Sequence, residues 1–395
     1  MAEIAPFRAL RFAEPAGALE DLITPPYDVI SEAERDRLYR RSPFNFVRVE
    51  YPKPDGDPYT EAASTLAVWR AEGVLREDPA PALYVHDHEF VVDGARLRRR
   101  GFHCALRLRA LDEGVVLPHE LTFPNPRADR LALLRATRAN TSAVFAMYPD
   151  EKGEIAGTLT RSVAVGGSAA LVADVARGDE RHRIWAVNDS RPIAELSKAL
   201  ASRRVYIADG NHRYETALTY LAERGEQDAA ARYTLAYLCA LEDPGLRIFA
   251  KHRIVHGDGL ADAIDRSFEQ APVDAGALGD IQPGIVVARE GRFTQLHLRA
   301  DADLSALRPA WRNLPVAQAE ELLLRRAREA GAEVSYEHDL KAAIAAAERG
   351  TTAVLLRAID PETLRRVADA GERLPQKTTY FYPKVPAGLV VRSLD

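Results

Sequence analysis

The sequence is poor in cysteine, methionine and tryptophan, with 2, 2 and 3 of these residues among 395. The two cysteines, Cys104 and Cys239, lie far apart and match no spacing of a metal-binding or redox motif. Cysteine usage of this kind is typical of a reducing compartment, so we expect a cytoplasmic location. A chain of this length can bury a large core without disulfide bonds.

Long apolar runs are also missing. None approaches the length of a membrane-spanning helix, and the opening residues "MAEIAPFRALRF" lack the apolar core of a secretion signal. We therefore expect no membrane partner.

Two further absences concern nucleic acids and nucleotides. The formal net charge of -5 argues against non-specific binding to a polyanion, and we recognise no helix-turn-helix with basic recognition residues. The chain has no glycine-rich loop ending in Gly-Lys-Ser or Gly-Lys-Thr, which excludes a Walker-type nucleotide site. Nucleic acid is thus disfavoured as a partner, and a nucleotide needs another kind of site.

Strand and helix patterns mix along the chain without a regular alternation. This predicts an α+β (mixed α/β) fold, in which helices accompany mixed sheets. We expect three regions: an N-terminal α+β region over 1–150 with the "PPYDVIS" and "PHELT" loops, a region over 151–258, and a C-terminal α+β region over 259–395. In the last of these, the tail "QKTTYFYPK" is expected to return to the functional site.

Local signals predict several elements of the first region. "SEAERDRLYRRS" predicts a helix with a capping box formed by Ser31 and Glu34. The segment "FNFVRVEY", from Phe44 to Tyr51, predicts a strand. Two apolar runs around Asp93 and Gly94 predict an antiparallel hairpin.

The most informative segment is "VYIADGNHRYETALTYLAERG", which begins as a strand and ends as a helix. The residues Asp209, Gly210, Asn211, His212 and Arg213 occupy the turn between the two. A helix start leaves backbone N–H groups unpaired and favours an anion, and glycine lets a ligand approach closely. His212 and Arg213 would add donors to phosphate or carboxylate oxygens. Asp209 suits a metal ligand or a general base.

A structural interpretation of the same turn stays open. Asp or Asn at this place can simply cap the helix, and a histidine and an arginine in an exposed first turn can simply be solvated.

Other candidates stand outside this turn. Glu120 in "PHELT" can act as a base or metal ligand or can face water, and the missing second histidine argues against a zinc protease. His86 and His88 share one strand face and are either a metal-binding pair or a polar sheet face. Tyr27 and Asp28 follow a Pro-Pro turn, which is either a binding loop or a rigid entry to the next helix.

The motifs in order along the chain resemble the domain-of-unknown-function family 1015. They are "PPYDVIS", "NFVRVE", "PHELT", "DRLALLRATRAN", "IADGNHRYETAL", "LEDPGLRIF" and "LPQKTTYFYPKVPAGLV", and they cover nearly the whole chain.

The turn "DGNHR" is in addition similar to the "DGHHR" of free serine kinases in the ParB/sulfiredoxin superfamily. That resemblance implies a ParB/sulfiredoxin-like nucleotide-binding core elaborated by insertions. It further implies that His212 and Arg213 contact phosphates and that Asp209 accepts the proton of a substrate hydroxyl. Asn211 departs from the first histidine of that pattern, which leaves one phosphate contact in doubt.

The remaining motifs receive roles from the same resemblance. Lys377 and Thr378 would close over the phosphates, as would Arg130 and Arg138 on their helix. Glu120 would position Mg²⁺ or the acceptor. Tyr27 and Asp28 would line the acceptor pocket. The alternatives are structural: Lys377 can anchor the tail, and Arg138 can pair with a carboxylate.

The sequence thus predicts an ATP-dependent kinase, with Mg²⁺ and ATP or another nucleotide as cofactors. Its acceptor would be the hydroxyl of a small metabolite, such as free serine or a related hydroxy acid. The alternatives are a ParB-like regulator that binds and hydrolyses a nucleotide, and a binding protein without enzymatic activity.

Overall fold

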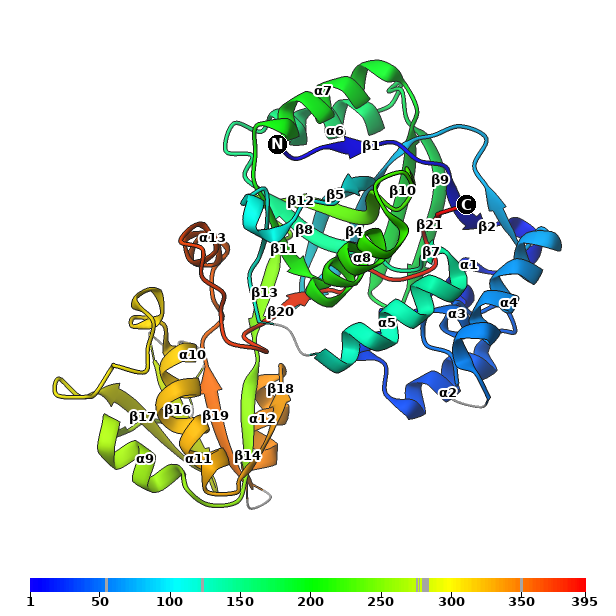
Figure 1. Cartoon of the computed structure of the whole chain (residues 1–395). Helices are drawn as coiled ribbons and strands as arrows, with labels where there is room; N and C mark the ends of the chain where they lie inside the picture. Colours follow the sequence, from blue (N-terminus) through cyan, green and yellow to red (C-terminus); the bar gives the residue numbers. More distant parts are fainter. Residues whose placement is uncertain (54–55, 122–123, 275, 277, 279–283, 349–350) are drawn as a thin grey trace. The chain divides into compact units, whose positions relative to one another are not determined.

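The computed structural model describes residues 1–53, 56–121, 124–274, 276, 278, 284–348 and 351–395. The chain forms two compact units (Figure 1). Unit 1 comprises Met1–Pro118, Thr122–Leu246 and Pro383–Asp395, and unit 2 comprises His119–Leu121 and Arg247–Tyr382. Both units mix sheets with helices, which confirms the α+β fold class. The division into the regions 1–150, 151–258 and 259–395 stays a prediction. Unit 1 contains residues of all three regions.

Unit 1 is built around one large mixed sheet. Its strands run in the order β6-β11-β8-β12-β5-β4-β10-β9, and β1 pairs with β5. Their bounds are β1 Ile4–Ala5, β4 Leu83–Val92, β5 Ala95–Arg107, β6 Val116–Pro118, β8 Val144–Tyr148, β9 Ala170–Arg177, β10 Glu180–Val187, β11 Val205–Asp209 and β12 Tyr233–Ala240.

A smaller sheet of unit 1 joins the two ends of the chain. Its order is β3-β2-β21-β7, with β2 Ala9–Phe12, β3 Leu75–Glu77, β7 Ala139–Asn140 and β21 Val391–Ser393. Because β21 lies between β2 and β7, the C-terminal tail is held by backbone hydrogen bonds on both sides.

The helices of unit 1 cover the sheets and close the core. They are α1 Leu19–Leu22, α2 Glu32–Arg41, α3 Val47–Glu50, α4 Pro58–Ala71, α5 Pro124–Thr137, α6 Glu154–Val163, α7 Ser190–Ala201 and α8 Asn211–Arg224, with short 3-10 turns at Glu14–Ala16, Tyr27–Val29 and Leu111–Glu113. Apolar residues of α6, α7 and α8 pack into one cluster with the strands of the large sheet, including Leu159, Leu196 and Tyr214.

Unit 2 has a sheet with an apolar cluster on each face. The order is β15-β17-β16-β19-β14-β18. Neighbouring residues of one strand belong to different clusters: Val255 contacts the cluster of α9 and α11, and Ile254 contacts that of α12. This follows from the two-residue period of a strand, which points successive side chains to opposite faces.

The elements of unit 2 have the following bounds. The strands are β13 Arg247–Ala250, β14 His252–His256, β15 Phe268–Pro272, β16 Ile285–Arg289, β17 Arg292–Leu298, β18 Glu333–Glu337, β19 Thr352–Leu356 and β20 Thr379–Tyr382, of which β13 and β20 pair separately. The helices are α9 Leu260–Ser267, α10 Pro315–Gln318, α11 Arg325–Glu329, α12 Leu340–Glu348 and α13 Pro361–Asp369; a π-helical turn at Ala319–Leu324 joins α10 to α11, and a 3-10 turn lies at Pro309–Trp311.

The hairpin and the capped helix are confirmed, whereas the strand expected over "FNFVRVEY" is wrong. Asp93 and Gly94 connect β4 to β5 with positive φ angles of 49° and 77°, and Ser31 accepts the amide of Glu34 at the start of α2. In place of the strand, Val47–Glu50 forms the short helix α3. Its valines are buried among apolar residues of two different clusters, so tertiary packing overrides their preference for strands.

Over the residues that the structure describes, no helix has both the length and the apolarity required to span a membrane.

Candidate functional site

The turn after β11 has the predicted strand-turn-helix form. Strand β11 ends at Asp209, and α8 begins at Asn211. Between them Gly210 has a φ of 89°, a left-handed conformation in which a side chain is strained. Gly210 is itself the N-cap residue, and no side chain caps the helix there. Side-chain capping at the N-cap position itself therefore does not account for this turn.

The guanidinium of Arg213 folds back over Gly210. A Cβ atom on Gly210 would lie 2.8 Å from Nε of Arg213, so the missing side chain makes room for this guanidinium rather than for an outside ligand. One end of the guanidinium donates to the carbonyl of Ala143, and Nη2 donates to Oδ2 of Asp209 at 2.7 Å.

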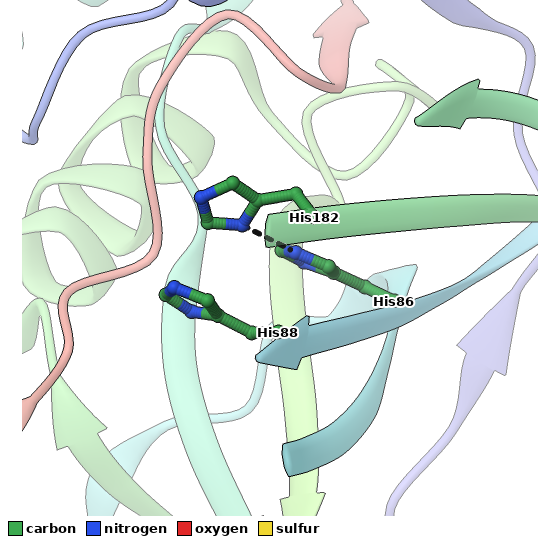
Figure 2. A group of neighbouring side chains, drawn as sticks. All are labelled: His86, His88 and His182. Atoms are coloured by element: carbon green, nitrogen blue, oxygen red, sulfur yellow. Dashed lines mark hydrogen bonds between the residues drawn. The ribbon is translucent and has the colours of Figure 1, made fainter. Parts of the chain in front are cut away.

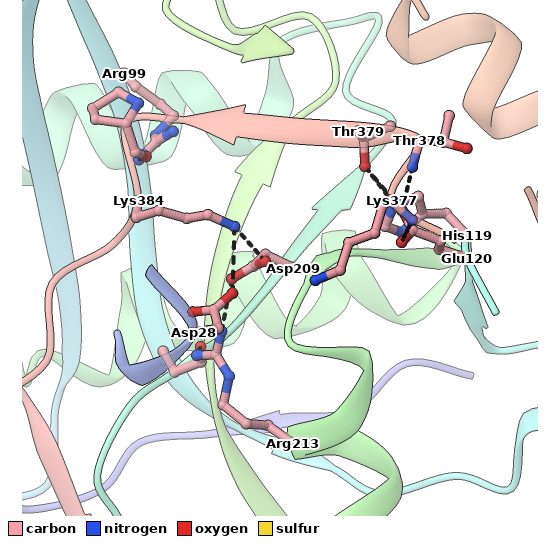
Figure 3. A network of polar contacts seen from close by, with 12 residues as sticks. Asp28, Arg99, His119, Glu120, Asp209, Arg213, Lys377, Thr378, Thr379 and Lys384 are labelled. Carbon is pink, nitrogen blue, oxygen red and sulfur yellow. Dashed lines mark hydrogen bonds and ion pairs between the residues drawn. The ribbon is translucent and has the colours of Figure 1, made fainter. Parts of the chain in front are cut away.

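Lys384 is the second cation on Asp209. Its Nζ lies 2.5 Å from Oδ1 of Asp209 and 3.9 Å from Oδ2 of Asp28 (Figure 3). The side chains of Lys384 and Arg213 are each 11% exposed and that of Asp209 is 17% exposed, so these ion pairs are partly desolvated. The carboxylate of Asp209 thus has one cation on each oxygen.

The backbone before Lys384 is fixed by a buried arginine. Arg99 donates from Nη2 to the carbonyl of Pro383 at 2.9 Å, and its own side chain has no exposure to solvent. The same guanidinium lies 4.9 Å from the ring centre of Phe145. Arg99 therefore helps to hold the segment from which Lys384 reaches Asp209.

A fully buried carboxylate, Glu50, organises the neighbouring loops. Its oxygens accept the hydroxyls of Thr141 and Ser142 at 2.6 and 2.8 Å and the amide of Tyr27 at 3.3 Å. The guanidinium of Arg130 donates to the Glu50 carbonyl at 2.7 Å and lies 4.0 Å from the ring centre of Tyr27. The structure thus brings the predicted residues Tyr27 and Arg130 together.

The charges of Asp28 and Asp209 shift the pKa values of the neighbouring side chains. Burial lowers the pKa of Arg213, but the carboxylates of Asp209 and Asp28 outweigh it and hold this pKa above its ordinary value. Burial, reinforced by the charge of Asp28, raises the pKa of Tyr27, so its phenol stays protonated. We name the group of Tyr27, Asp28, Asp209, Arg213 and Lys384 the Asp209 cluster.

A cavity of about 40 Å³ adjoins Arg213 in unit 1. Its lining consists of Arg130, Leu133, Leu134, Ala139, Asn140, Thr141, Ser142, Arg213, Thr216 and Thr234. The lining thus includes two arginines and four hydroxyl-bearing residues, and cationic and hydroxyl groups are the kinds that bind a small anion.

Asn211 and His212 occupy the first turn of α8. Both residues are half-buried, and Oδ1 of Asn211 is buried without a hydrogen-bond partner. An orphaned buried oxygen of this kind requires an explanation, such as a bound donor. The phosphate contacts expected of both residues stay predictions.

Glu120, Lys377 and Thr378 lie together in unit 2. Oε1 of Glu120 accepts the amide of Lys377 at 2.5 Å, and Oε2 accepts the amide of Thr378 at 3.3 Å (Figure 3). His119 lies 3.5 Å from Oε2 of Glu120 and 2.8 Å from the hydroxyl of Thr379. Lys377 has a φ of 56°, so this contact holds a residue in the left-handed region.

The pKa of Glu120 reflects these partners. Burial raises it, but the hydrogen bonds from His119 and from the amide of Lys377 prevail, and the pKa lies below its ordinary value. Glu120 is thus a stably ionised group that binds the backbone before β20. Its role toward Mg²⁺ or an acceptor stays a prediction, as do the phosphate contacts of Lys377 and Thr378. Thr122 of "PHELT" lies outside the described residues.

Arg138 lies just beyond the C-terminal end of α5, where its φ is 46°. Nε donates to the carboxylate of Asp395 at 2.8 Å and Nη2 to the carbonyl of Leu394 at 3.1 Å. Arg138 thus pairs with a carboxylate, as the structural alternative expected. A contact between Arg138 and phosphate stays a prediction.

Sequence reasoning missed Lys384, Glu50 and the pair Thr141 and Ser142. Lys384 and Glu50 stand inside motifs already noted, "YPKVPAGLV" and "NFVRVE", but local patterns give them no special weight. Lys384 meets Asp209 across 175 residues of sequence, so only the fold brings the two together.

Comparisons with known proteins concern the family of the chain. A family model described as "Protein of unknown function (DUF1015)" matches residues 4–317. No curated protein matches the sequence significantly.

Several solved structures resemble the chain at low identity. A conserved hypothetical protein from Pyrococcus furiosus is 13% identical with a TM-score of 0.40, over 74% of this chain and 95% of that chain. A free serine kinase in complex with AMP is 12% identical with a TM-score of 0.38, over 71% and 86%. A C-terminally truncated SbnI from Staphylococcus aureus is 10% identical with a TM-score of 0.42, over 72% and 86%. Likenesses at this level assign no function to this chain. The match over residues 4–317 shows that the chain belongs to the DUF1015 family.

Proposed function

We propose that this protein is a nucleotide-dependent phosphotransferase that phosphorylates the hydroxyl of a small metabolite at the Asp209 cluster. The observation that carries the proposal is the carboxylate of Asp209 at the N-terminus of α8, bound by Arg213 on one oxygen and by Lys384 on the other.

Phosphoryl transfer requires little from a protein beyond this set of groups. It needs neutralised phosphate charge, a fixed position for the acceptor and a group that accepts the hydroxyl proton. Arg213, Lys384 and the start of α8 supply positive charge, and Asp209 supplies the proton acceptor.

We infer that phosphate exchanges with Asp209 as the partner of Arg213. The cavity beside Arg213 is also lined by Arg130 and by four hydroxyl-bearing residues, and a phosphate group is proposed to enter from that side. Once Arg213 binds phosphate, the carboxylate of Asp209 accepts the proton of the acceptor hydroxyl. The acceptor oxygen then bonds to phosphorus while the bond from phosphorus to the nucleotide breaks.

The chemistry of the cluster fits Mg²⁺ as well. Mg²⁺ binds proteins through one or two carboxylates together with substrate phosphates, and the carboxylates of Asp28 and Asp209 provide such oxygens. The ammonium of Lys384 contacts both carboxylates, so Mg²⁺ would take the place of this ammonium there. When bound, Mg²⁺ would neutralise phosphate charge.

The acceptor side is proposed to include Tyr27 and Asp28. Asp28 is 33% exposed on its side chain and can receive a polar metabolite, and Tyr27 offers a neutral phenol. A carboxylate suits the ammonium group of an amino acid, so free serine is the first candidate for the acceptor.

The test is to incubate the protein with ATP, Mg²⁺ and a pool of hydroxylated metabolites, including serine, and to search by mass for a phosphorylated product. Arg213→Ala is expected to lower the rate of product formation at least about a hundredfold, because a charge-stabilising donor is lost. The matched control is Arg135→Ala, which removes an exposed arginine of α5 paired with Glu223 and is expected to retain the activity.

The outcomes separate the candidate functions. Product formation that Arg213→Ala leaves unchanged would contradict the assignment of the site. Nucleotide binding without any product would favour a binding or regulatory protein over a kinase.

A further inference from the structure

Three histidines of unit 1 converge on one face of the large sheet. His86 and His88 are two residues apart on β4, so they point to the same side, and the register of β4 with β10 places His182 directly opposite His88. Their side chains are buried, and one ring nitrogen of each lies within 4.8 Å of those of the other two (Figure 2). Sequence reasoning found the first two residues and lacked the third, because β10 contributes it from 94 residues further along the chain.

We propose that His86, His88 and His182 bind a divalent transition-metal ion, with Zn²⁺ as the best match. This site shares no residue with the Asp209 cluster, and the proposal does not depend on the proposed phosphotransfer.

The ligand set supports an ion of this kind. Imidazole nitrogens suit Zn²⁺, Co²⁺, Ni²⁺ and Cu²⁺, and three histidines with an open fourth position are a known zinc arrangement. Bonds of about 2.0–2.1 Å in a tetrahedral site separate two ligand nitrogens by roughly 3.3 Å. Nε2 of His86 and Nδ1 of His182 are already 3.1 Å apart, so these two rings need little movement to share an ion.

A fourth histidine orients the first. Nε2 of His103 lies 3.1 Å from Nδ1 of His86, on the side opposite His182. If Nδ1 of His86 donates to His103, Nε2 keeps the lone pair that faces the site. Hydrogen bonds of this kind to the second ring nitrogen accompany most metal-binding histidines.

Two charged groups, Glu180 and Arg99, border the site. Nε2 of His88 lies 2.7 Å from Oε2 of Glu180, and Nη2 of Arg99 lies 3.3 Å from Nδ1 of His88. Both ring nitrogens of His88 are therefore hydrogen-bonded. A metal ion can bind His88 only if it replaces one of these two hydrogen bonds. Glu180 is also 3.7 Å from Nε2 of His182, so its carboxylate can neutralise the ion or occupy the fourth position.

The alternative is a hydrogen-bonded histidine cluster that binds no ion. The contacts of His86 with His103 and with His182 form such a chain without any metal. The two arrangements differ in a measurable property, namely saturable binding of one equivalent of metal.

The experiment is a titration of chelator-treated full-length protein with Co²⁺, followed by the visible absorption of the bound ion and by competition with Zn²⁺. We expect one equivalent to bind, with absorption typical of nitrogen ligands in a four- or five-coordinate site, and Zn²⁺ to displace Co²⁺. His182→Gln is expected to weaken Zn²⁺ binding more than about a hundredfold, beyond the loss usual for an outer-sphere residue.

Two further variants make the result decisive if His182→Gln folds poorly. Glu180→Gln, at a side chain that is 36% exposed, is expected to fold and to weaken Zn²⁺ binding about tenfold or more. His256→Gln removes an exposed histidine in unit 2 and is the control, with unchanged affinity. Absence of bound Co²⁺ and Zn²⁺ in the wild-type protein, or equal Zn²⁺ affinity in wild type and a folded His182→Gln variant, would overturn the proposal.

Discussion

Two carboxylates of this protein, Asp209 in unit 1 and Glu120 in unit 2, are both expected to act in catalysis, yet they have different partners. Asp209 contacts two side-chain cations, Arg213 and Lys384. Glu120 contacts the backbone amides of residues 377 and 378. Side chains can rotate away from a carboxylate when a ligand arrives, whereas backbone amides move only if the segment refolds. The comparison shows that Asp209 is bound by mobile side chains, which the proposed exchange of partners requires, and that Glu120 is bound to the backbone.

The largest expected effect concerns Asp209. Asp209→Asn removes the proposed proton acceptor while it keeps the shape of the side chain, and we expect turnover to fall about a thousandfold. The measurement is the initial rate of ADP formation with the identified acceptor. A rate within a few fold of the wild type would place the proton acceptor elsewhere.

Lys384 gives the next largest effect. Lys384→Met keeps the length of the side chain but removes one of the two cations on Asp209, and we expect turnover to fall about a hundredfold. Lys384→Arg restores the charge and is expected to recover part of the activity. The kinetic comparison of these two variants separates the loss of charge from the loss of packing.

Glu120 is expected to affect stability. Glu120→Gln leaves the amides of residues 377 and 378 with a weaker acceptor, and we expect the free energy of unfolding to fall by about 1–3 kcal/mol. Chemical denaturation at neutral pH measures this loss. No change in stability would show that the contacts of Glu120 with the backbone are dispensable.

The same contact predicts a dependence on pH. Because the pKa of Glu120 is lower in the folded protein than its ordinary value of 4.5, its contribution to stability is present above pH 4.5. That contribution is lost as the pH falls through the folded pKa. The difference in stability between wild type and Glu120→Gln should therefore shrink below pH 4.5, and a difference that grows there would contradict the assigned sign.

Local sequence signals predicted those parts of the fold that depend on neighbours in the chain. The turn at Asp93 and Gly94, the cap at Ser31 and the strand-turn-helix around Gly210 all follow from residues a few positions apart. Turns and helix caps depend on the backbone freedom of glycine and on hydrogen bonds from short polar side chains to nearby amides. Both act over a few residues, so the local sequence was sufficient to predict these elements.

Long-range contacts account for what the sequence did not predict. Val47 and Val49 favour a strand by themselves, but their burial in two clusters stabilises a helix. Lys384 meets Asp209, and His182 meets His88, only because the fold brings distant segments together. A single sequence contains no direct signal for such pairs.

The central claim is that phosphate replaces Asp209 as the partner of Arg213, and the affinity of Asp209→Asn for ATP tests it most directly. Calorimetric titration without Mg²⁺ avoids any contribution of the carboxylate to metal binding. If Asp209 competes with phosphate for Arg213, the variant should bind ATP about tenfold more tightly than the wild type although it has lost turnover. Equal or weaker binding by the variant would contradict the exchange of partners and with it the proposed mechanism.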